Sequence, residues 1–342
     1  MSEKHPQVSI VMPYHNSAAT IGESIGSILR QGFTSWELIA VNDHSSDESE
    51  EIVKDFADKD SRIKPIRSFD RGIANALNRG IESSSAHLIA RMDADDLMLP
   101  DRLIAQVDHL LRNPSLGLVS CKVRHWPCGD HDSRGYENYV EWTNRQLSHE
   151  QISLGSFIES PLAHPSVIFR RELILKYGLY ENGPFPEDYE LWLRFLANGV
   201  KMEKLDQTLL KWRDLPTRLS RKSTNYSKDA FQKIKAKYLS KWIKSNLMEE
   251  IEIRGWGAGR IALTQAKHLW AHGLRLEIFY DVDKKKFGKP RNGLTVKSVD
   301  EIPPPGKVFL LVLAGARSAR PKIRSFLQAR KYLEGRDYLF VA

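Results

Sequence analysis

Two short acidic segments hold the side chains best suited to chemistry in this sequence. In the first, RMDADD, the residues Asp93, Asp95 and Asp96 follow an apolar run. Carboxylates this close repel one another unless a cation or hydrogen-bond donors offset the repulsion. A hard divalent ion accepts such oxygen ligands and can also bridge to a diphosphate. The alternative is that Asp96 caps the following helix while Asp93 and Asp95 are solvated loop carboxylates, and this segment alone favours neither.

The second acidic segment is PEDYELWLR, in which Glu187 and Asp188 precede a helical pattern. A carboxylate on a rigid support can act as a general base. The preceding PFP disfavours helix and holds the chain extended, and the apolar face of YELWLRFL would anchor the helix to a core. In isolation, a helix cap with favourable dipole interactions explains the two acidic residues better than catalysis does.

Both segments need a scaffold that brings separate loops together, and the first part of the chain predicts one. The apolar run VSIVM, a helical pattern over 18–31 and the apolar run WELIAVND form a βαβ unit. A helix around 49–59, a strand at 63–66, a helix over 72–83 and the strand HLIARMD continue the alternation. We therefore expect an open α/β sheet with helices on both faces, whose ligands bind at the carboxyl ends of the strands.

The loops expected at those carboxyl ends contain polar motifs. VMPYHN, VNDHSSD and RMDADD end in the loops 13–16, 43–47 and 93–96, and RGIANALNRGI lies between the last two. Their order and spacing are those of successive βα loops, so we expect them to line one cleft. A helix over 100–112 and a strand over 116–123 continue the domain.

Together these motifs resemble the family 2 glycosyltransferases of the GT-A fold, over roughly residues 8–220. The resemblance implies a mixed, mostly parallel sheet with helices on both faces. It also implies an enzyme that moves a sugar from a nucleotide-diphosphate-sugar, expected to be a UDP-sugar, to a hydroxyl of a saccharide or lipid-linked acceptor. The implied reaction is a metal-assisted, inverting displacement in surface polysaccharide or glycan assembly.

The same resemblance assigns the donor side of the cleft. VNDHSSD resembles the family's VDDGSSD, so Asp43 is expected to read the nucleobase. DADD resembles the family's DxD, so Asp93 is expected at the donor ribose or phosphate and, with Asp95, at a Mn²⁺ or Mg²⁺ ion. Pro13 and His15 are expected at the base, and His15 stands where the family usually has Tyr. Arg71 and either Asn75 or Asn78 are expected at the base or diphosphate. Arg213 and Ser220 of WRDLPTRLS are expected at the diphosphate.

The acceptor side is assigned in the same way. Asp188 matches the acidic residue of the family's ED motif that deprotonates the acceptor, and Glu187 would contact the acceptor or cap the helix. His164 of HPSVIFRR is expected on the sugar or acceptor side, and a hydrogen-bonded structural histidine explains it equally well. Charge developing on the leaving diphosphate would be stabilised by the metal and Arg213 while Asp188 takes the acceptor proton.

The sequence near the carboxyl terminus predicts a further strand, a Gly-rich turn, a helix and a second strand. Gly257, Gly259 and Ala262 of GWGAGRIA form GxGxxA, and Asp281 and Asp283 fall at the end of the second strand, where an acidic residue can meet a ribose. This pattern predicts a smaller Rossmann-like α/β module whose ligand the sequence does not identify.

The pattern also fixes the expected domains. We predict a glycosyltransferase domain over 1–240, which includes a basic helical segment at 221–245 as a linker, and the module over 250–342. The GxGxxA turn raises the alternative of an NAD-dependent oxidoreductase. That motif alone is a weak signal, and about eighty residues are too few for a dinucleotide fold with a substrate site.

The net charge of +8 and the isoelectric point of about 9.3 allow nucleic acid, an anionic membrane or phosphorylated substrates as partners. In KIKAKYLSKWIKSN, the aromatic Tyr238 and Trp242 lie at helical spacing with Ile234, Leu239 and Ile243. Such a stripe is simplest as an apolar face packed on a domain, so we expect no nucleic-acid partner, although a basic nucleic-acid-binding protein is a second alternative. Docking of the lysine face to an anionic membrane stays open.

Cysteine usage and hydropathy give the expected location. Cys121 and Cys128 form no pattern typical of a disulfide framework or a zinc site. No stretch approaches the roughly 20 apolar residues of a membrane span. The sequence therefore predicts a cytoplasmic protein, with peripheral contact at the inner face of the membrane as an option.

Overall fold

The computed structural model describes residues 5–288 and 293–342. The chain divides into two compact units, each with its own sheet. The first unit comprises the residues up to 152 together with 161–226, and the second comprises 153–160 and 227–342.

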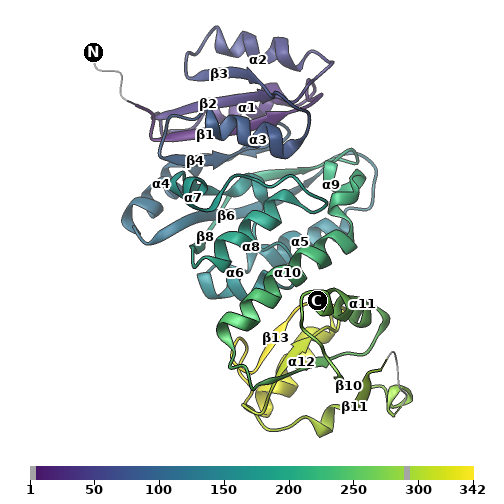
Figure 1. Cartoon of the computed structure of the whole chain (residues 1–342). Helices are drawn as coiled ribbons and strands as arrows, with labels where there is room; N and C mark the ends of the chain where they lie inside the picture. Colours follow the sequence, from purple (N-terminus) through teal and green to yellow (C-terminus); the bar gives the residue numbers. More distant parts are fainter. Residues whose placement is uncertain (1–4, 289–292) are drawn as a thin grey trace. The chain divides into compact units, whose positions relative to one another are not determined.

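The alternating elements expected at the start of the chain are present in the first unit (Figure 1). They are β1 (Val8–Tyr14), α1 (Ile21–Leu29), β2 (Trp36–Asn42), α2 (Ser49–Ala57), β3 (Ile63–Arg67), α3 (Ile73–Glu82) and β4 (Leu88–Arg91). Every residue of β1 and β2 is buried, as expected for strands covered on both faces. The two strands are parallel, and Tyr14 pairs with Asn42, so both strands deliver their following loops to the same edge.

Helices cover both faces of this sheet, as the sequence predicts. Ile10 and Met12 point into one apolar core, which includes α1 and the later helix α4 (Arg102–Arg112). Val11, between them, points into a second core with side chains of α3 and of α8 (Glu187–Ala197). This alternation follows from the two-residue period of a strand.

The second half of the first unit makes the sheet mixed. Its strands are β5 (Leu97–Met98), β6 (Leu116–Pro127), β7 (Ile168–Arg170) and β8 (Lys201–Asp214), and the sheet order is β3-β2-β1-β4-β7-β6-β8-β5. β7 runs antiparallel to β4 and β6, and β5 runs antiparallel to β8. The remaining helical segments are α5 (Arg134–Asn144), α6 (His149–Gly155), η1 (His164–Ser166), α7 (Glu172–Tyr177), α9 (Leu219–Lys222) and η2 (Thr224–Tyr226).

The second unit contains a sheet of parallel strands, in the order β11-β10-β9-β12-β13. The strands are β9 (Glu252–Trp256), β10 (Ile278–Asp281), β11 (Thr295–Ser298), β12 (Val308–Val312) and β13 (Tyr338–Phe340). Helices α11 (Arg260–Trp270) and α12 (Ala319–Ala329) and the short turns η3 (Lys284–Lys286) and η4 (Val299–Glu301) connect them. The first strand, β9, lies in the middle, which is the arrangement of a Rossmann-like sheet.

The basic segment folds as α10 (Lys228–Asn246), and it packs within the second unit. Ile234, Tyr238, Leu239 and Ile243 are buried, as expected for an apolar stripe. Lys235 is also buried, where burial lowers its pKa to about 8 and its Nζ donates to the carbonyl oxygens of Val341 (2.8 Å) and Ile158 (3.2 Å). The second unit thus resumes at residue 227 and includes this helix, which was predicted to be a linker within the first domain.

Within the described residues, none of the helices combines the length and the apolar character that crossing a bilayer requires.

Candidate active site

The RMDADD carboxylates gather in the loop that follows β4. Their oxygen atoms lie within 4.8 Å of one another, and among the described residues they are the group that could hold a metal ion. Asp96 is fully buried, and its Oδ1 accepts a hydrogen bond from the backbone N–H of Arg213 at 2.8 Å. Its Oδ2 is buried and accepts no hydrogen bond in the described part of the chain. Asp96 does not cap a helix, because the N-cap of α4 is Asp101.

This clustering makes negative charge costly. Burial, followed by repulsion from Asp93, raises the pKa of Asp95 to about 6. Burial and repulsion from Asp95 and Asp93 raise the pKa of Asp96 well above its ordinary value. A cation beside these carboxylates would remove the cost, since an opposite charge favours the ionised form.

Two arginines lie at the same cluster, Arg213 at the end of β8 and Arg218 shortly after it, and the pairing of β6 with β8 sets the position of Arg213. Trp126 of β6 pairs with Arg213, and the Arg213 guanidinium stacks over its ring at 4.0 Å. Arg213 Nε donates to the carbonyl oxygen of Asp95 at 2.6 Å, and Nη2 donates to Glu23 at 2.6 Å. Arg218 Nη1 donates to the carbonyl oxygen of Arg213 at 2.6 Å.

Arg218 was missed by the sequence reasoning. Burial disfavours its charge, but attraction from Asp96, Tyr136 and Asp95 raises its pKa overall. The second arginine of WRDLPTRLS was the available signal. Arg218 therefore belongs to the positive charge beside the acidic cluster.

Ser220 lies in the same segment, where its hydroxyl hydrogen-bonds the Tyr136 hydroxyl. Contacts with Asp214 hold the segment after β8 in place. Asp214 is a fully buried carboxylate that the sequence reasoning also missed. Burial would raise the pKa of Asp214, but hydrogen bonds from Arg221 and His125, with His131 Nε2 3.2 Å away, lower it overall. Arg221 Nη2 donates to both carboxylate oxygens at 2.9 Å.

The residues expected at the nucleobase lie together after β1 and β2. His15 Nδ1 donates to the carbonyl oxygen of Asp43 at 2.7 Å, and His15 Nε2 accepts from Arg71 Nη2 at 3.0 Å. The Asp43 carboxylate accepts from the N–H of Gly72 at 2.9 and 3.1 Å, and Asn75 donates to the carbonyl oxygen of Arg71 at 3.1 Å. Pro13 sits near the end of β1, paired with Val41.

Asn78, the other candidate at this position, is engaged elsewhere. Its side-chain amide donates to the carbonyl oxygen of Tyr180 at 2.9 Å and accepts from the N–H of Tyr180 at 2.9 Å. Both hydrogen-bonding ends of Asn78 hold the Tyr180 loop against α3, which leaves Asn75 as the candidate closer to Arg71.

Glu187 and Asp188 are the first two residues of α8, after the N-cap Pro186. Asp188 Oδ1 accepts from the N–H of Tyr189 at 2.7 Å. Burial, followed by repulsion from Glu187, raises the pKa of Asp188 to about 8, although attraction from Arg91 opposes the shift.

Glu187 is buried in a small polar network. Tyr226 Oη donates to Glu187 Oε2 at 2.5 Å, and His164 Nδ1 lies 3.9 Å from Oε1. Burial and the charge of Arg91 hold the pKa of His164 well below its ordinary value, so the imidazole is neutral near pH 7. Its Nε2 is 2.8 Å from the hydroxyl oxygen of Tyr180. Tyr226 was missed by the sequence reasoning, because it lies 39 residues after Glu187 in no motif.

Arg91 connects the two acidic segments. It is buried at the end of β4, and its Nη2 donates to Asp93 Oδ1 at 2.5 Å. Burial disfavours its charge, but Asp93, Tyr180 and Glu187 raise its pKa overall. Its charge also acts on Asp188. The charge of Arg91 thus partly offsets the negative charge of both acidic segments, which lie in one unit, although the pKa values of Asp95 and Asp188 stay raised.

This fold and these paired acidic clusters define a glycosyltransferase of the GT-A class. The model of the family described as Glycosyl transferase family 2 matches residues 9–178. The O-antigen biosynthesis glycosyltransferase WbnJ of Escherichia coli is 30% identical over 241 residues, which cover 69% of this chain and 89% of WbnJ. The chain belongs to glycosyltransferase family 2.

Other relatives are also named as glycosyltransferases. The putative glycosyltransferase EpsE of Bacillus subtilis is 30% identical and matches 66% of this chain and 79% of its own length. The E. coli enzyme WfgD, named a UDP-Glc:alpha-D-GlcNAc-diphosphoundecaprenol beta-1,3-glucosyltransferase, is 30% identical over 56% of this chain and 70% of its own.

Solved structures share the fold at low identity. TarS 1–349 of S. aureus in complex with UDP-GlcNAc superposes with a TM-score of 0.54 at 14% identity, over 78% of this chain and 71% of TarS. PcManGT of Pyrobaculum calidifontis, a mannosyltransferase in complex with GDP-Man and Mn²⁺, gives 0.50 at 20% identity, over 71% and 65% of the two chains. Family membership decides against an oxidoreductase as the chain's main activity, and the packed α10 stripe supports a structural role for its aromatic residues.

Proposed function

We propose that this enzyme transfers a sugar from a nucleotide-diphosphate-sugar to a hydroxyl of a saccharide or lipid-linked acceptor, with inversion, in surface polysaccharide or glycan assembly. The observation that carries the proposal is the coupling of two acidic clusters through the buried Arg91. The names of WbnJ and WfgD, an O-antigen enzyme and a glucosyltransferase with a diphosphoundecaprenol-linked acceptor, support this setting. A UDP-sugar is the expected donor, by analogy with WfgD and TarS.

The donor would lie along the ends of β1, β2 and β4. His15, Asp43 and Arg71, which already contact one another, would hold the nucleobase, with Pro13 and Asn75 beside them. Asp93 would contact the ribose or a phosphate. Arg213 at the end of β8, with Arg218 and Ser220 in the segment after it, would face the diphosphate, because Arg213 donates to the carbonyl oxygen of Asp95 and Arg218 donates to that of Arg213.

A Mn²⁺ or Mg²⁺ ion would be held by Asp95 and Asp93, with Asp96 behind them. The fit rests on three hard oxygen donors within 4.8 Å of one another and on the buried Asp96 Oδ2 that accepts no hydrogen bond in the described part of the chain. The Mn²⁺ of PcManGT supports the same kind of ion. When bound, such an ion supplies positive charge for the departing diphosphate.

Asp188 would take the acceptor's proton. Its Oδ1 is engaged by the N–H of Tyr189, which leaves Oδ2 for the acceptor hydroxyl. Once ionised, a carboxylate with a pKa of about 8 is a stronger proton acceptor than an ordinary aspartate. Glu187, held by Tyr226, would fix the acceptor beside it, and attack from the face opposite the leaving diphosphate inverts the anomeric carbon.

A donor screen tests this function. The chain is incubated with a panel of UDP-, GDP- and dTDP-sugars, Mn²⁺ or Mg²⁺, and a diphosphoundecaprenol-type acceptor, and the release of nucleoside diphosphate is followed. We expect release from one class of donor that requires both metal and acceptor. Release from none of the donors, or release that is indifferent to EDTA, would contradict the proposal.

The lipid-linked acceptor also suggests where the enzyme works. A cytoplasmic enzyme at the inner face of the membrane could use the exposed lysines of α10, such as Lys241 and Lys244, on an anionic surface. Co-sedimentation with anionic vesicles that falls as salt rises would support this docking. Equal recovery with neutral vesicles would argue against it.

A further inference from the structure

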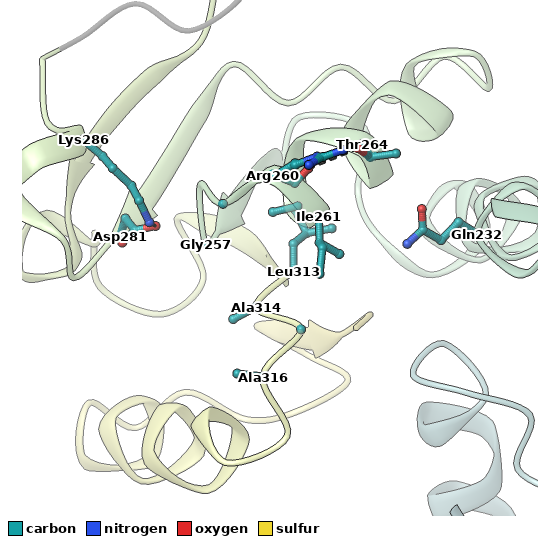
Figure 2. Close-up of a pocket in the computed structure, with 13 residues that line it drawn as sticks. Gln232, Gly257, Arg260, Ile261, Thr264, Asp281, Lys286, Leu313, Ala314 and Ala316 are labelled. Carbon is teal, nitrogen blue, oxygen red and sulfur yellow. Dashed lines mark hydrogen bonds and ion pairs between the residues drawn. The ribbon is translucent and has the colours of Figure 1, made fainter. Parts of the chain in front are cut away.

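The second unit has a pocket of about 690 Å³ at the carboxyl ends of its central strands (Figure 2). Its lining includes Gly257 and Gly259 of the β9–α11 turn, Ala314 and Gly315 after β12, and Asp281 at the end of β10. β10 and β12 flank β9 on opposite sides. The pocket therefore lies at the point where the chain order reverses, which is where open parallel sheets bind ligands. The volume lies in the range of small-molecule sites.

The two glycines of the turn have different reasons to be glycine. Gly257 has φ +96°, and an added Cβ would lie 3.2 Å from the backbone nitrogen of Ala314, so the fold itself requires it. Gly259 has an ordinary extended backbone, with φ −80° and ψ 170°. A Cβ added there would meet nothing within 4 Å. Neither the backbone conformation nor the packing requires glycine at position 259. A ligand that approaches the backbone closely would require it.

Charges around the turn match one kind of ligand. The first turn of α11 has no acidic residue, and Arg260 is exposed there, so the helix start favours an anion. Asp281 is buried beside the turn, where it accepts from the N–H of Ala258 at 2.8 Å and pairs with Lys286 at 2.8 Å. Figure 2 shows Asp281 and Lys286 on one side of Gly257 and Arg260 on the other.

We propose that this pocket binds a ribonucleoside diphosphate group, in a second nucleotide site separate from the donor site of the first unit. The diphosphate lies over Gly259 at the start of α11, next to Arg260. The ribose hydroxyls reach Asp281, and Ile261, which is exposed and lines the pocket, offers an apolar contact. A nucleotide sugar and a dinucleotide both carry this group.

Calorimetry on the full-length chain tests the site. UDP, ADP and NAD⁺ are titrated in EDTA, so that the metal-dependent donor site is silent. We expect one metal-independent equivalent for at least one of these probes. Gly259→Val and Arg260→Glu should weaken it about 10- to 100-fold with an unchanged melting temperature, because the added side chain at 259 enters open space.

Two controls separate this site from the donor site. Gly32→Val, at another glycine where an added Cβ meets nothing within 4 Å, should leave the binding unchanged, and so should Asp95→Asn. Preference for UDP would assign a nucleotide sugar as the ligand, and preference for NAD⁺ a dinucleotide. The proposal fails if none of the probes binds in EDTA, if Asp95→Asn removes the binding, or if Gly259→Val and Arg260→Glu leave it intact.

Discussion

The candidate sites of the two units lie at equivalent points, beside the carboxyl ends of parallel strands, yet they consist of different kinds of residue. In the first unit the site consists of buried and half-buried carboxylates, and the half-buried Asp95 and Asp188 have pKa values of about 6 and about 8. In the second unit the pocket is lined by glycines and alanines together with Arg260, Lys286 and the carboxylate of Asp281. Burial would raise the pKa of Asp281, but hydrogen bonds from Lys286 and from backbone amides lower it overall.

The difference separates chemistry from binding. Ionisable side chains whose charge burial has made costly cluster at catalytic sites, and such costs are tolerated where function requires them. A binding pocket needs only space and oriented N–H groups, which a Gly-rich turn supplies at little cost. We therefore expect substitutions in the first unit to change turnover, and substitutions in the second to change binding alone.

The largest expected effect is at Asp188. Asp188→Asn should lower transfer by roughly 10²- to 10⁴-fold with little change in donor affinity, because a general base acts only in the transition state. Glu187→Gln is the matched comparison, and transfer rate and nucleotide-sugar affinity are measured on both. A large loss only in Glu187→Gln would move the role of base one residue back.

The same variant has a stability signature. The raised pKa means that the folded chain binds the proton of Asp188 more tightly than the unfolded chain does. The stability that this proton contributes to the folded chain is lost as pH rises toward about 8. Above that pH the wild-type chain holds a buried carboxylate that Asp188→Asn lacks. The variant should therefore unfold at a higher temperature than wild type at high pH, which a calorimetric scan measures and which excludes misfolding as the cause of lost turnover.

Asp95→Asn comes next. It should weaken the metal-dependent part of UDP or related nucleotide binding by about 10- to 100-fold, because the repelling carboxylates lose a ligand for the cation. Calorimetry with Mn²⁺ and with EDTA measures this part, and Asp108→Asn, at an exposed aspartate paired with Arg112, is the control. Metal-dependent binding that survives in Asp95→Asn would remove the residue from the metal site.

A smaller effect is expected from Tyr226→Phe. Loss of its hydrogen bond to Glu187 should reduce turnover about 3- to 10-fold, with unchanged donor affinity. Tyr332→Phe removes a comparable buried hydroxyl in the second unit, where it donates to the carbonyl oxygen of Pro303. Equal losses of turnover in both variants would indicate a general effect on folding rather than positioning of Glu187.

The smallest effect is expected from the second unit. Gly259→Val and Arg260→Glu should leave transfer within about twofold of wild type, because neither residue lies in the unit that holds the acidic clusters. Steady-state rates with donor and acceptor at saturation measure this. A large fall in turnover in these folded variants would make the module part of the active site and remove the contrast between the units.

Much of the fold could be predicted because its signals are local. The buried runs of β1 and β2 and the amphipathic patterns of α1 and α3 are written in consecutive residues, so their positions came out within a few residues. The mixed half of the sheet could not be derived in this way. The pairing of β6 with β8 joins residues about ninety positions apart, and no local pattern specifies it.

The site divides along the same line. Asp93, Asp95, Glu187 and Asp188 stand in motifs. The structure brings Asp93 and Asp95 into one cluster and places the buried Glu187 and the half-buried Asp188 at the start of α8. Arg91, Tyr226 and Arg218 act through contacts that only the fold creates. Arg91 was part of the RMDADD segment, and an arginine at the end of an apolar run, directly before three carboxylates, was the signal that could have found it.

The central claim is that Asp188, with its raised pKa, takes the proton of the acceptor. It is tested most directly by the pH dependence of kcat/KM for transfer at saturating metal, in wild type and in Asp188→Asn. The base works only when ionised, so the wild-type rate should rise with pH toward an apparent pKa of about 8, a value that burial and repulsion from Glu187 raise and that Arg91 opposes. The residual rate of the variant should lack this rise. A wild-type profile that stays flat between about pH 5 and pH 9, or an unchanged rise in Asp188→Asn, would contradict the account.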